Sequence, residues 1–247
     1  MNERIPAIPR EPAERRRRSK LLWIVVALFV ILLVVLFFRS SLSRVTSIEV
    51  TGNYYVSQAE IAQALNVQIG DSFFAPGSKT LERRVGQLPA VNAVQAKKRF
   101  PGKLTIVVKE YQPVAVELGA DGKLGLVLES GLVLPSKEGT ALPNKPVLAG
   151  WSADDPQRLE LCRVLAKIQD AQLGDLSQIS PDPSKAYPDR IKLYTRSRFE
   201  VITTVGKLAD KIDILNELVE NREPGQVVML DSDTYRPYSA QTASSSG

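Results

Sequence analysis

Residues 21–38 form an unbroken apolar run, LLWIVVALFVILLVVLFF, with no polar or charged side chain. As a helix this run would extend about 27 Å, close to the roughly 30 Å thickness of a bilayer's hydrocarbon core. It is longer than the apolar core of a cleaved signal peptide, which has about 7–15 residues, and no A-x-A cleavage pattern follows it. We therefore predict a retained transmembrane helix over residues 21–38.

Basic side chains gather on the N-terminal side of this run. Those directly before it are Arg15, Arg16, Arg17, Arg18 and Lys20, whereas Arg39 and Arg44 are the nearest basic residues after it. Cytoplasmic flanks of transmembrane helices carry an excess of Lys and Arg. The asymmetry predicts a type II, single-pass cell-membrane protein, with a cytoplasmic basic tail at residues 1–20 and its bulk outside the cytoplasm.

Five segments after the run have the apolar periodicity of strands or helices. In order they are a strand at 45–51, a helix at 57–66, a helix at 78–88 and strands at 91–99 and 103–110. Ser57 and Glu60 have the spacing of a capping box, which marks the start of the first helix. Phe100-Pro101-Gly102 is a turn signal between the last two strands. The order predicts a small β-α-α-β-β domain over residues 45–112.

The remaining chain shows further short strands and two amphipathic helices. The strands are predicted at 114–119, 124–129, 131–135, 191–194, 199–205 and 227–230, and the helices at 156–168 and 207–220. We expect a mixed, mainly antiparallel β domain with two helices at residues 113–238. Residues 239–247 are too polar to pack and are predicted to be disordered. The fold class is therefore α+β, with a single transmembrane helix before two small domains.

Charge and rare residues narrow the function. The formal net charge is +5, but residues 1–20 alone carry +4, so the charge is a topology signal and only weakly suggests nucleic acid. The chain has no histidine and a single cysteine, Cys162. Histidine-based catalysis, histidine metal sites and an intrachain disulfide are thereby excluded. Cys162 lies in an apolar helical segment, and we expect it to be a buried small hydrophobe.

The acidic residues could supply a carboxylate pair for glycoside cleavage. They are Asp154, Asp155, Asp182, Asp189, Asp231 and Asp233, and most sit beside Pro, Gly or Ser. Asp at such positions favours turns and helix caps, because its carboxylate bonds the local backbone. No Ser-x-x-Lys nucleophile motif occurs in the chain. We expect a protein that is not an enzyme and that holds no cofactor or metal.

The run KKRFPGKLTIVVKEYQPVAVE at residues 97–117, after the β-α-α-β-β order and the preceding span, resembles the POTRA (polypeptide-transport-associated) domain of the FtsQ/DivIB family. The resemblance extends over nearly the whole chain. It implies a non-enzymatic division scaffold at the septum that recruits or stabilises the FtsB/DivIC and FtsL-type pair. That pair would link it indirectly to the septal peptidoglycan synthases. The alternative is a POTRA-bearing polypeptide-transport or envelope-assembly component.

The terminal segment is the predicted partner site. It comprises an apolar run and the polar and aromatic residues after it: Val227, Val228, Met229, Leu230, Tyr235, Arg236 and Tyr238. One interpretation is that both faces of this strand are covered within the domain. The other is an open edge that accepts a strand from a partner, with the tyrosines as anchors. In the FtsQ/DivIB family the C-terminal strands recruit the pair, so the resemblance favours the second interpretation.

Two smaller features leave alternatives open. The charge run Lys97-Lys98-Arg99 is either a solvated strand face that protects an edge or a contact for lipid headgroups or an acidic partner. The Tyr187-Pro188 bond is compatible with either isomer. The oligomeric state does not follow from the sequence.

Overall fold

The computed structural model describes residues 15–119, 122–135 and 144–239. The predicted disorder of residues 239–247 falls almost wholly outside these residues, as does most of the predicted cytoplasmic tail. The first helix, α1, spans Arg15–Arg39 and includes the predicted span together with the basic residues before it. Among the described residues it is the single helix long and apolar enough to cross a membrane, and no residue of its apolar window is buried.

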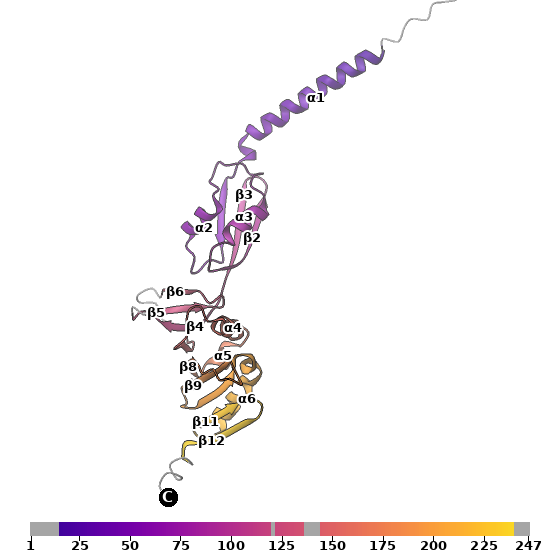
Figure 1. The fold of residues 1–247 in the computed structure, drawn as a ribbon. Helices are drawn as coiled ribbons and strands as arrows, with labels where there is room; N and C mark the ends of the chain where they lie inside the picture. Colours follow the sequence, from indigo (N-terminus) through magenta and orange to yellow (C-terminus); the bar gives the residue numbers. More distant parts are fainter. Residues whose placement is uncertain (1–14, 120–121, 136–143, 240–247) are drawn as a thin grey trace, which may run out of the picture. The chain divides into compact units, whose positions relative to one another are not determined.

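The chain forms two compact units. The first comprises Met1–Gly52, Gln58–Val85 and Val94–Val108, and the second comprises Asn53–Ser57, Gly86–Ala93 and Lys109–Gly247. Figure 1 shows the order of elements along the chain. Each unit is described by itself.

The first unit is built around a three-stranded sheet of order β1-β3-β2. Its elements are η1 (Ser41–Ser43), β1 (Ser47–Thr51), α2 (Gln58–Leu65), α3 (Ser78–Val85), β2 (Val91–Arg99) and β3 (Lys103–Glu110). β1 runs parallel to β3, with Ser47 opposite Lys103 and Thr51 opposite Val107. The observed order confirms the predicted β-α-α-β-β arrangement.

Apolar periodicity explains how this unit packs. Ile61 and Leu65 of α2 are buried, four residues apart on one helix face, and Leu81 and Val85 of α3 are placed in the same way. Every second residue of β3 from Leu104 to Val108 is buried. Gly52 closes β1 with a φ of +82°, and a Cβ at this position would collide with the carbonyl oxygen of Val108.

The second unit contains a nine-stranded sheet of order β12-β11-β10-β9-β8-β7-β4-β5-β6. Its strands are β4 (Pro113–Leu118), β5 (Leu124–Leu128), β6 (Val133–Pro135), β7 (Val147–Leu148), β8 (Leu176–Pro181), β9 (Arg190–Thr195), β10 (Glu200–Thr204), β11 (Gly225–Met229) and β12 (Asp233–Pro237). Its helices are α4 (Pro156–Leu165), α5 (Asp170–Leu173), η2 (Val205–Lys207) and α6 (Leu208–Asn221). Most neighbouring pairs are antiparallel, and β4–β7, β7–β8 and β10–β11 are parallel. The sheet is therefore mixed and mainly antiparallel, as predicted.

One face of this sheet packs against the helices. Leu161 and Leu165 of α4 and Ile212 and Leu215 of α6 are buried in one cluster with the sheet residues that face them, such as Leu193. α4 begins with Asp155 as its N-cap, whose Oδ1 accepts a 2.8 Å hydrogen bond from the amide of Gln157, and with Pro156 in its first turn. Figure 1 shows α4 and α6 beside the strands of this unit.

The structure corrects the sequence prediction at three places. The segment at 227–230, predicted to be the final strand, is β11, and a further strand, β12, follows it. β7 and β8 are not among the predicted strands. The unit also contains the one-turn helix α5 beside the two predicted helices.

Candidate functional site

The C-terminal strands form one end of the nine-stranded sheet, and β12 is the edge strand there. β11 runs parallel to β10 and antiparallel to β12. Parallel neighbours need a long crossover connection, and α6 supplies it between β10 and β11. Within the part of the chain that the structure describes, no strand pairs with the outer side of β12. The candidate site is this open edge together with the two sheet faces beside it.

The predicted apolar residues support the edge from inside. Val227 and Met229 are each 1% exposed and belong to the core cluster. Val228 and Leu230 are half-buried. The apolar run therefore holds β11 in the domain, and the surface available to a partner lies on β12 and beyond it.

Tyr235 faces the core side of β12. Its Cα lies opposite that of Val227, and its ring centroid is 6.4 Å from that of Phe199. Its hydroxyl donates a 2.7 Å hydrogen bond to the carbonyl oxygen of Glu223. The half-buried ring thus fixes β12 to its own domain and leaves the backbone of the strand at the edge.

A row of four residues crosses the other face of the sheet. From β9 to β12 the paired residues are Tyr194, Glu200, Gln226 and Arg236. Successive residues of a strand point to opposite faces of the sheet. The sequence neighbours of this row, such as Leu193, Val201 and Val227, lie in the core, so the row lies on the opposite face. The Glu200 carboxylate accepts a 3.1 Å hydrogen bond from the Gln226 amide. The row ends at the exposed Arg236 on the edge strand.

Tyr238 follows the edge strand and is 38% exposed. Its backbone N–H donates a 3.2 Å hydrogen bond to the carbonyl oxygen of Pro224. Burial of the phenol, followed by the nearby Glu200 carboxylate, raises the pKa of Tyr238. Tyr238 also lines a shallow surface depression with Arg198, Glu223, Pro224 and Ser239. An exposed aromatic ring on this part of the sheet is a suitable contact for a partner side chain.

The Tyr238 hydrogen bond also fixes which backbone groups of β12 point outward. In an antiparallel pair, residues alternate between those bonded to the partner strand and those turned away from it. Tyr238 bonds toward the β11 side, so Arg236 and Thr234 do the same along the unbroken register. Asp233 and Tyr235 therefore direct their N–H and C=O groups outward, and Pro237 directs only a C=O.

Comparison with known proteins places the chain. Residues 43–111 match the family model described as "POTRA domain, FtsQ-type". The cell division protein DivIB of Paenibacillus polymyxa (strain E681) is 38% identical, over 98% of this chain and 95% of the relative. The chain belongs to the FtsQ/DivIB family of bacterial cell division proteins.

Further DivIB proteins are more distant from this family member. The cell division protein DivIB of Bacillus anthracis is 29% identical over 79% of this chain and 73% of the relative. The cell division protein DivIB of Bacillus subtilis (strain 168) is 28% identical over 81% of this chain and 76% of the relative. A solved structure of the major extracytoplasmic domain of DivIB from Geobacillus stearothermophilus, in its trans isomer, is 30% identical. The match between the two structures covers 47% of the present chain and 99% of the Geobacillus chain, with a TM-score of 0.37.

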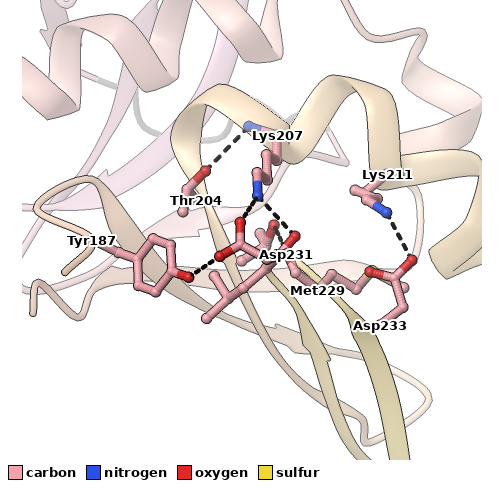
Figure 2. Close-up of polar contacts among 9 residues, drawn as sticks. Tyr187, Thr204, Lys207, Lys211, Met229, Asp231 and Asp233 are labelled. Carbon is pink, nitrogen blue, oxygen red and sulfur yellow. Dashed lines mark hydrogen bonds and ion pairs between the residues drawn. The ribbon is translucent and has the colours of Figure 1, made fainter.

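In the present chain, a polar cluster holds the turn between β11 and β12 (Figure 2). The Lys207 amine donates to the carbonyl oxygen of Leu230 at 2.8 Å and to Oδ1 of Asp231 at 2.9 Å. The hydroxyl of Tyr187 donates to the other Asp231 oxygen. The bond from Tyr187, followed by the bond and charge of Lys207, lowers the pKa of Asp231. The turn is thereby tied to the start of α6 and to the loop before β9.

Two further contacts hold the strands on either side of that turn. The Lys211 amine of α6 lies 2.7 Å from Oδ2 of Asp233, the first residue of β12 (Figure 2). The Thr203 hydroxyl of β10 donates a 2.9 Å hydrogen bond to the carbonyl oxygen of Met229. Lys211 thus positions the edge strand β12 and Thr203 positions its neighbour β11, and neither contact uses the outer backbone groups of β12.

The cysteine and the remaining acidic residues that were candidates for catalysis have structural roles in the fold. Cys162 is fully buried in α4, as predicted, and burial raises the pKa of its thiol to about 11. Asp155 caps α4, Asp182 pairs with Arg190 at 3.0 Å, and Asp189 accepts a 3.3 Å hydrogen bond from the amide of Gly206. In the described ranges, no group of three or more acidic, histidine or cysteine residues is placed to hold a metal ion.

Proposed function

We propose that this FtsQ/DivIB family member is a non-enzymatic assembly protein of the division machinery that binds a partner through the open edge of β12. The partner is the FtsB/DivIC and FtsL-type pair, which the resemblance to the family implies. By holding this pair at the septum, the protein stabilises the complex during septal peptidoglycan synthesis and is linked indirectly to the septal synthases. The observation that carries the proposal is the unpaired outer side of β12.

The proposed binding mode is addition of a strand to the sheet. The outward N–H and C=O groups of Asp233 and Tyr235, and the C=O of Pro237, supply the hydrogen bonds. Side chains beside the edge select the partner, because main-chain bonds are the same for any sequence. Arg236 and Tyr238 are the exposed residues of the terminal segment with the side chains that most often dominate interfaces.

The membrane arrangement belongs to the same proposal. α1 spans the membrane once, with Arg15, Arg16, Arg17, Arg18 and Lys20 on the cytoplasmic side, and the two units lie outside the cytoplasm. We place the proposed domain limits at 1–20 for the tail, 21–38 for the span, 45–112 for the POTRA domain, 113–238 for the β domain and 239–247 for the C-terminal tail. The relatives' names favour cell division over the polypeptide-transport alternative.

Binding of the full chain in lipid nanodiscs to a purified FtsB/DivIC–FtsL complex tests the proposal. We expect Arg236→Glu to weaken binding about 5- to 30-fold, because an exposed interface arginine contributes about 1–2 kcal/mol. Arg83→Glu is the matched control, since Arg83 is an exposed arginine on α3 in the other unit. Wild-type protein that does not bind, or equal loss in both variants, would contradict the proposal.

A further inference from the structure

The loop at residues 68–76 is tied to the segment that directly follows α1. Five residues separate the end of α1 from Val45, the first buried apolar residue of the unit. The amide of Val45 donates to the carbonyl of Asp71, and that of Gly70 donates to the carbonyl of Val45, each at 2.8 Å. The amide of Phe73 donates at 2.8 Å to the carbonyl of Ser43. The six Cα–Cα steps from Arg39 to Val45 reach at most about 22 Å, so the loop stays near the end of α1.

The turn at residues 100–102 lies at the same end of the first unit. The amide of Thr46 donates a 2.9 Å hydrogen bond to the carbonyl of Gly102. The rings of Phe73 and Phe100 are 6.3 Å apart, centroid to centroid. The loop, the turn and the start of β1 therefore make up one end of the unit.

Four apolar side chains at this end are exposed, and we name them the rim: Leu42 at 49%, Ile69 at 70%, Phe74 at 47% and Phe100 at 55%. Their neighbour Phe73 is only 6% exposed, so the loop has its own core contact and still presents these side chains. The rim is next to Arg39 and Arg44, and to the exposed Arg99. It is an apolar surface with a basic border.

Phe74 also contacts the last turn of α1. Its ring centroid lies 5.9 Å from that of Phe37 and 5.7 Å from that of Phe38. Phe37 and Phe38 are the final residues of the apolar run that we propose to cross the membrane. The rim is thereby continuous with the apolar surface of α1.

Lys98 fixes the loop in this position. Its amine donates 2.6 Å hydrogen bonds to the carbonyls of Phe73 and Pro76 and lies 5.5 Å from the centroid of the Phe73 ring. Desolvation lowers the pKa of this amine. Lys98, the central residue of the Lys97-Lys98-Arg99 run, therefore holds the loop by hydrogen bonds and is not a solvated surface lysine. The rim is held by a bonded framework.

We propose that the rim is a membrane-contact surface, with Ile69, Phe74 and Phe100 seated in the interfacial layer of the leaflet where α1 ends. This inference rests on the membrane arrangement proposed above. The occupant is the lipid surface, because five residues and the Phe37 and Phe38 contacts keep the rim beside the end of the span. Aromatic side chains favour the membrane interface, and the basic border suits anionic headgroups.

The proposal gives the POTRA unit a second attachment to the bilayer beside its helix. A unit joined to a span by a flexible segment would sample many tilts. Seating of the rim selects those tilts in which the loop and the turn contact lipid. The end of β3 marked by Val107, four residues along the β1–β3 ladder from Lys103, then lies about 13 Å farther along the strand from the rim end.

Depth-dependent quenching in nanodiscs of phosphatidylethanolamine and phosphatidylglycerol tests this placement. Phe74→Cys, Phe100→Cys and Val107→Cys are each labelled in the full chain with an environment-sensitive fluorophore, while the buried Cys162 stays unlabelled. We expect blue-shifted emission and loss of intensity with headgroup-proximal doxyl lipids at 74 and 100. Val107 is 36% exposed and is the matched control, for which neither change is expected.

The remaining arms separate the possible failures. Ile69→Cys, at an exposed loop position, repeats the measurement without removing an aromatic ring. Val30→Cys, at the middle of the apolar run, reports the span itself: if this label is not quenched by deep doxyl lipids, the membrane arrangement fails together with the rim. If it is quenched and the rim labels behave as Val107 does, the rim proposal alone is overturned. A blue shift at the rim without lipid quenching would place protein there and would also overturn it.

Discussion

Glu117 and Arg158 form the most buried ion pair described in the second unit, and they give a sharp stability prediction. The guanidinium of Arg158 on α4 lies 2.5 Å from Oε2 of Glu117 on β4 and also donates at 3.1 Å to the carbonyl of Gly131. The Arg158 side chain is 4% exposed and that of Glu117 is 27% exposed. Glu117→Gln removes the negative charge and leaves the buried guanidinium without its counterion.

The magnitude follows from the difference in exposure. Breaking a fully buried pair costs about 3–5 kcal/mol, because a charge stays desolvated. Solvent near Glu117 reduces the expected cost for Glu117→Gln to about 2–3 kcal/mol. Arg158→Met keeps most of the side-chain volume and leaves a carboxylate that can hydrate, so we expect about 1–2 kcal/mol from its lost hydrogen bonds.

Urea unfolding of the full chain in detergent micelles measures both variants. Trp151 packs against the core of the second unit, and its Nε1 donates a 3.1 Å hydrogen bond to the carbonyl of Ile179. In a Trp23→Phe background it is the single tryptophan and reports that unit alone. With an m-value of about 2 kcal/mol/M, Glu117→Gln should lower the unfolding midpoint by about 1–1.5 M.

The order of the variants is the decisive result. Glu117→Gln should cost more than Arg158→Met, and the double variant should resemble Arg158→Met because the stranded charge is gone. If Arg158→Met were the more destabilising single change, the reasoning from an uncompensated buried charge would be wrong.

Three further predictions concern single contacts. Asp231→Asn should speed amide hydrogen exchange in β11 and β12. In the wild type the pKa of Asp231 is lower in the folded than in the unfolded chain, so its ionised carboxylate stabilises the fold above about pH 4. This contribution is lost as the pH falls through the pKa of the folded state, and the variant should lack this pH dependence. Lys98→Met should speed exchange at residues 73–76, with Lys97→Met, an exposed neighbour, as the unchanged control. Cys162 should resist thiol reagents at pH 8 until urea unfolds the second unit, because its buried thiol has a pKa of about 11; rapid labelling of the folded chain would contradict its burial.

Local patterns were sufficient for most elements of the fold. The span, the β-α-α-β-β order and the helices α4 and α6 follow from apolar periodicity, which survives because one face of each element is buried. The sequence pattern does not indicate β8, because a register shift between Leu176 and Gln178 breaks the alternation of buried residues. β7 has only two residues, Val147 and Leu148, and its pairing depends on distant strands.

The sequence indicates the C-terminal segment that contains the candidate site, but not the strand that forms its edge. β12 contains Asp233 and Pro237, which strands disfavour, so the sequence pattern indicates β11 as the final strand. That β12 is the edge depends on the parallel crossover from β10 to β11, which no local pattern specifies. The functions of Lys98 and Arg158 depend on partners 22 to 41 residues away in the sequence, and charge alone did not reveal them.

The claim that a partner strand pairs with β12 is tested most directly by comparing Tyr235→Pro with Tyr235→Ala in the full chain. Both variants lose the ring, but proline also removes the outward N–H, at an edge position where a strand tolerates it. One main-chain hydrogen bond contributes about 0.5–1.5 kcal/mol. The proline variant should therefore bind a purified FtsB/DivIC–FtsL complex about 2- to 13-fold more weakly than the alanine variant. Equal affinities for the two variants, with both chains folded, would contradict pairing at this edge.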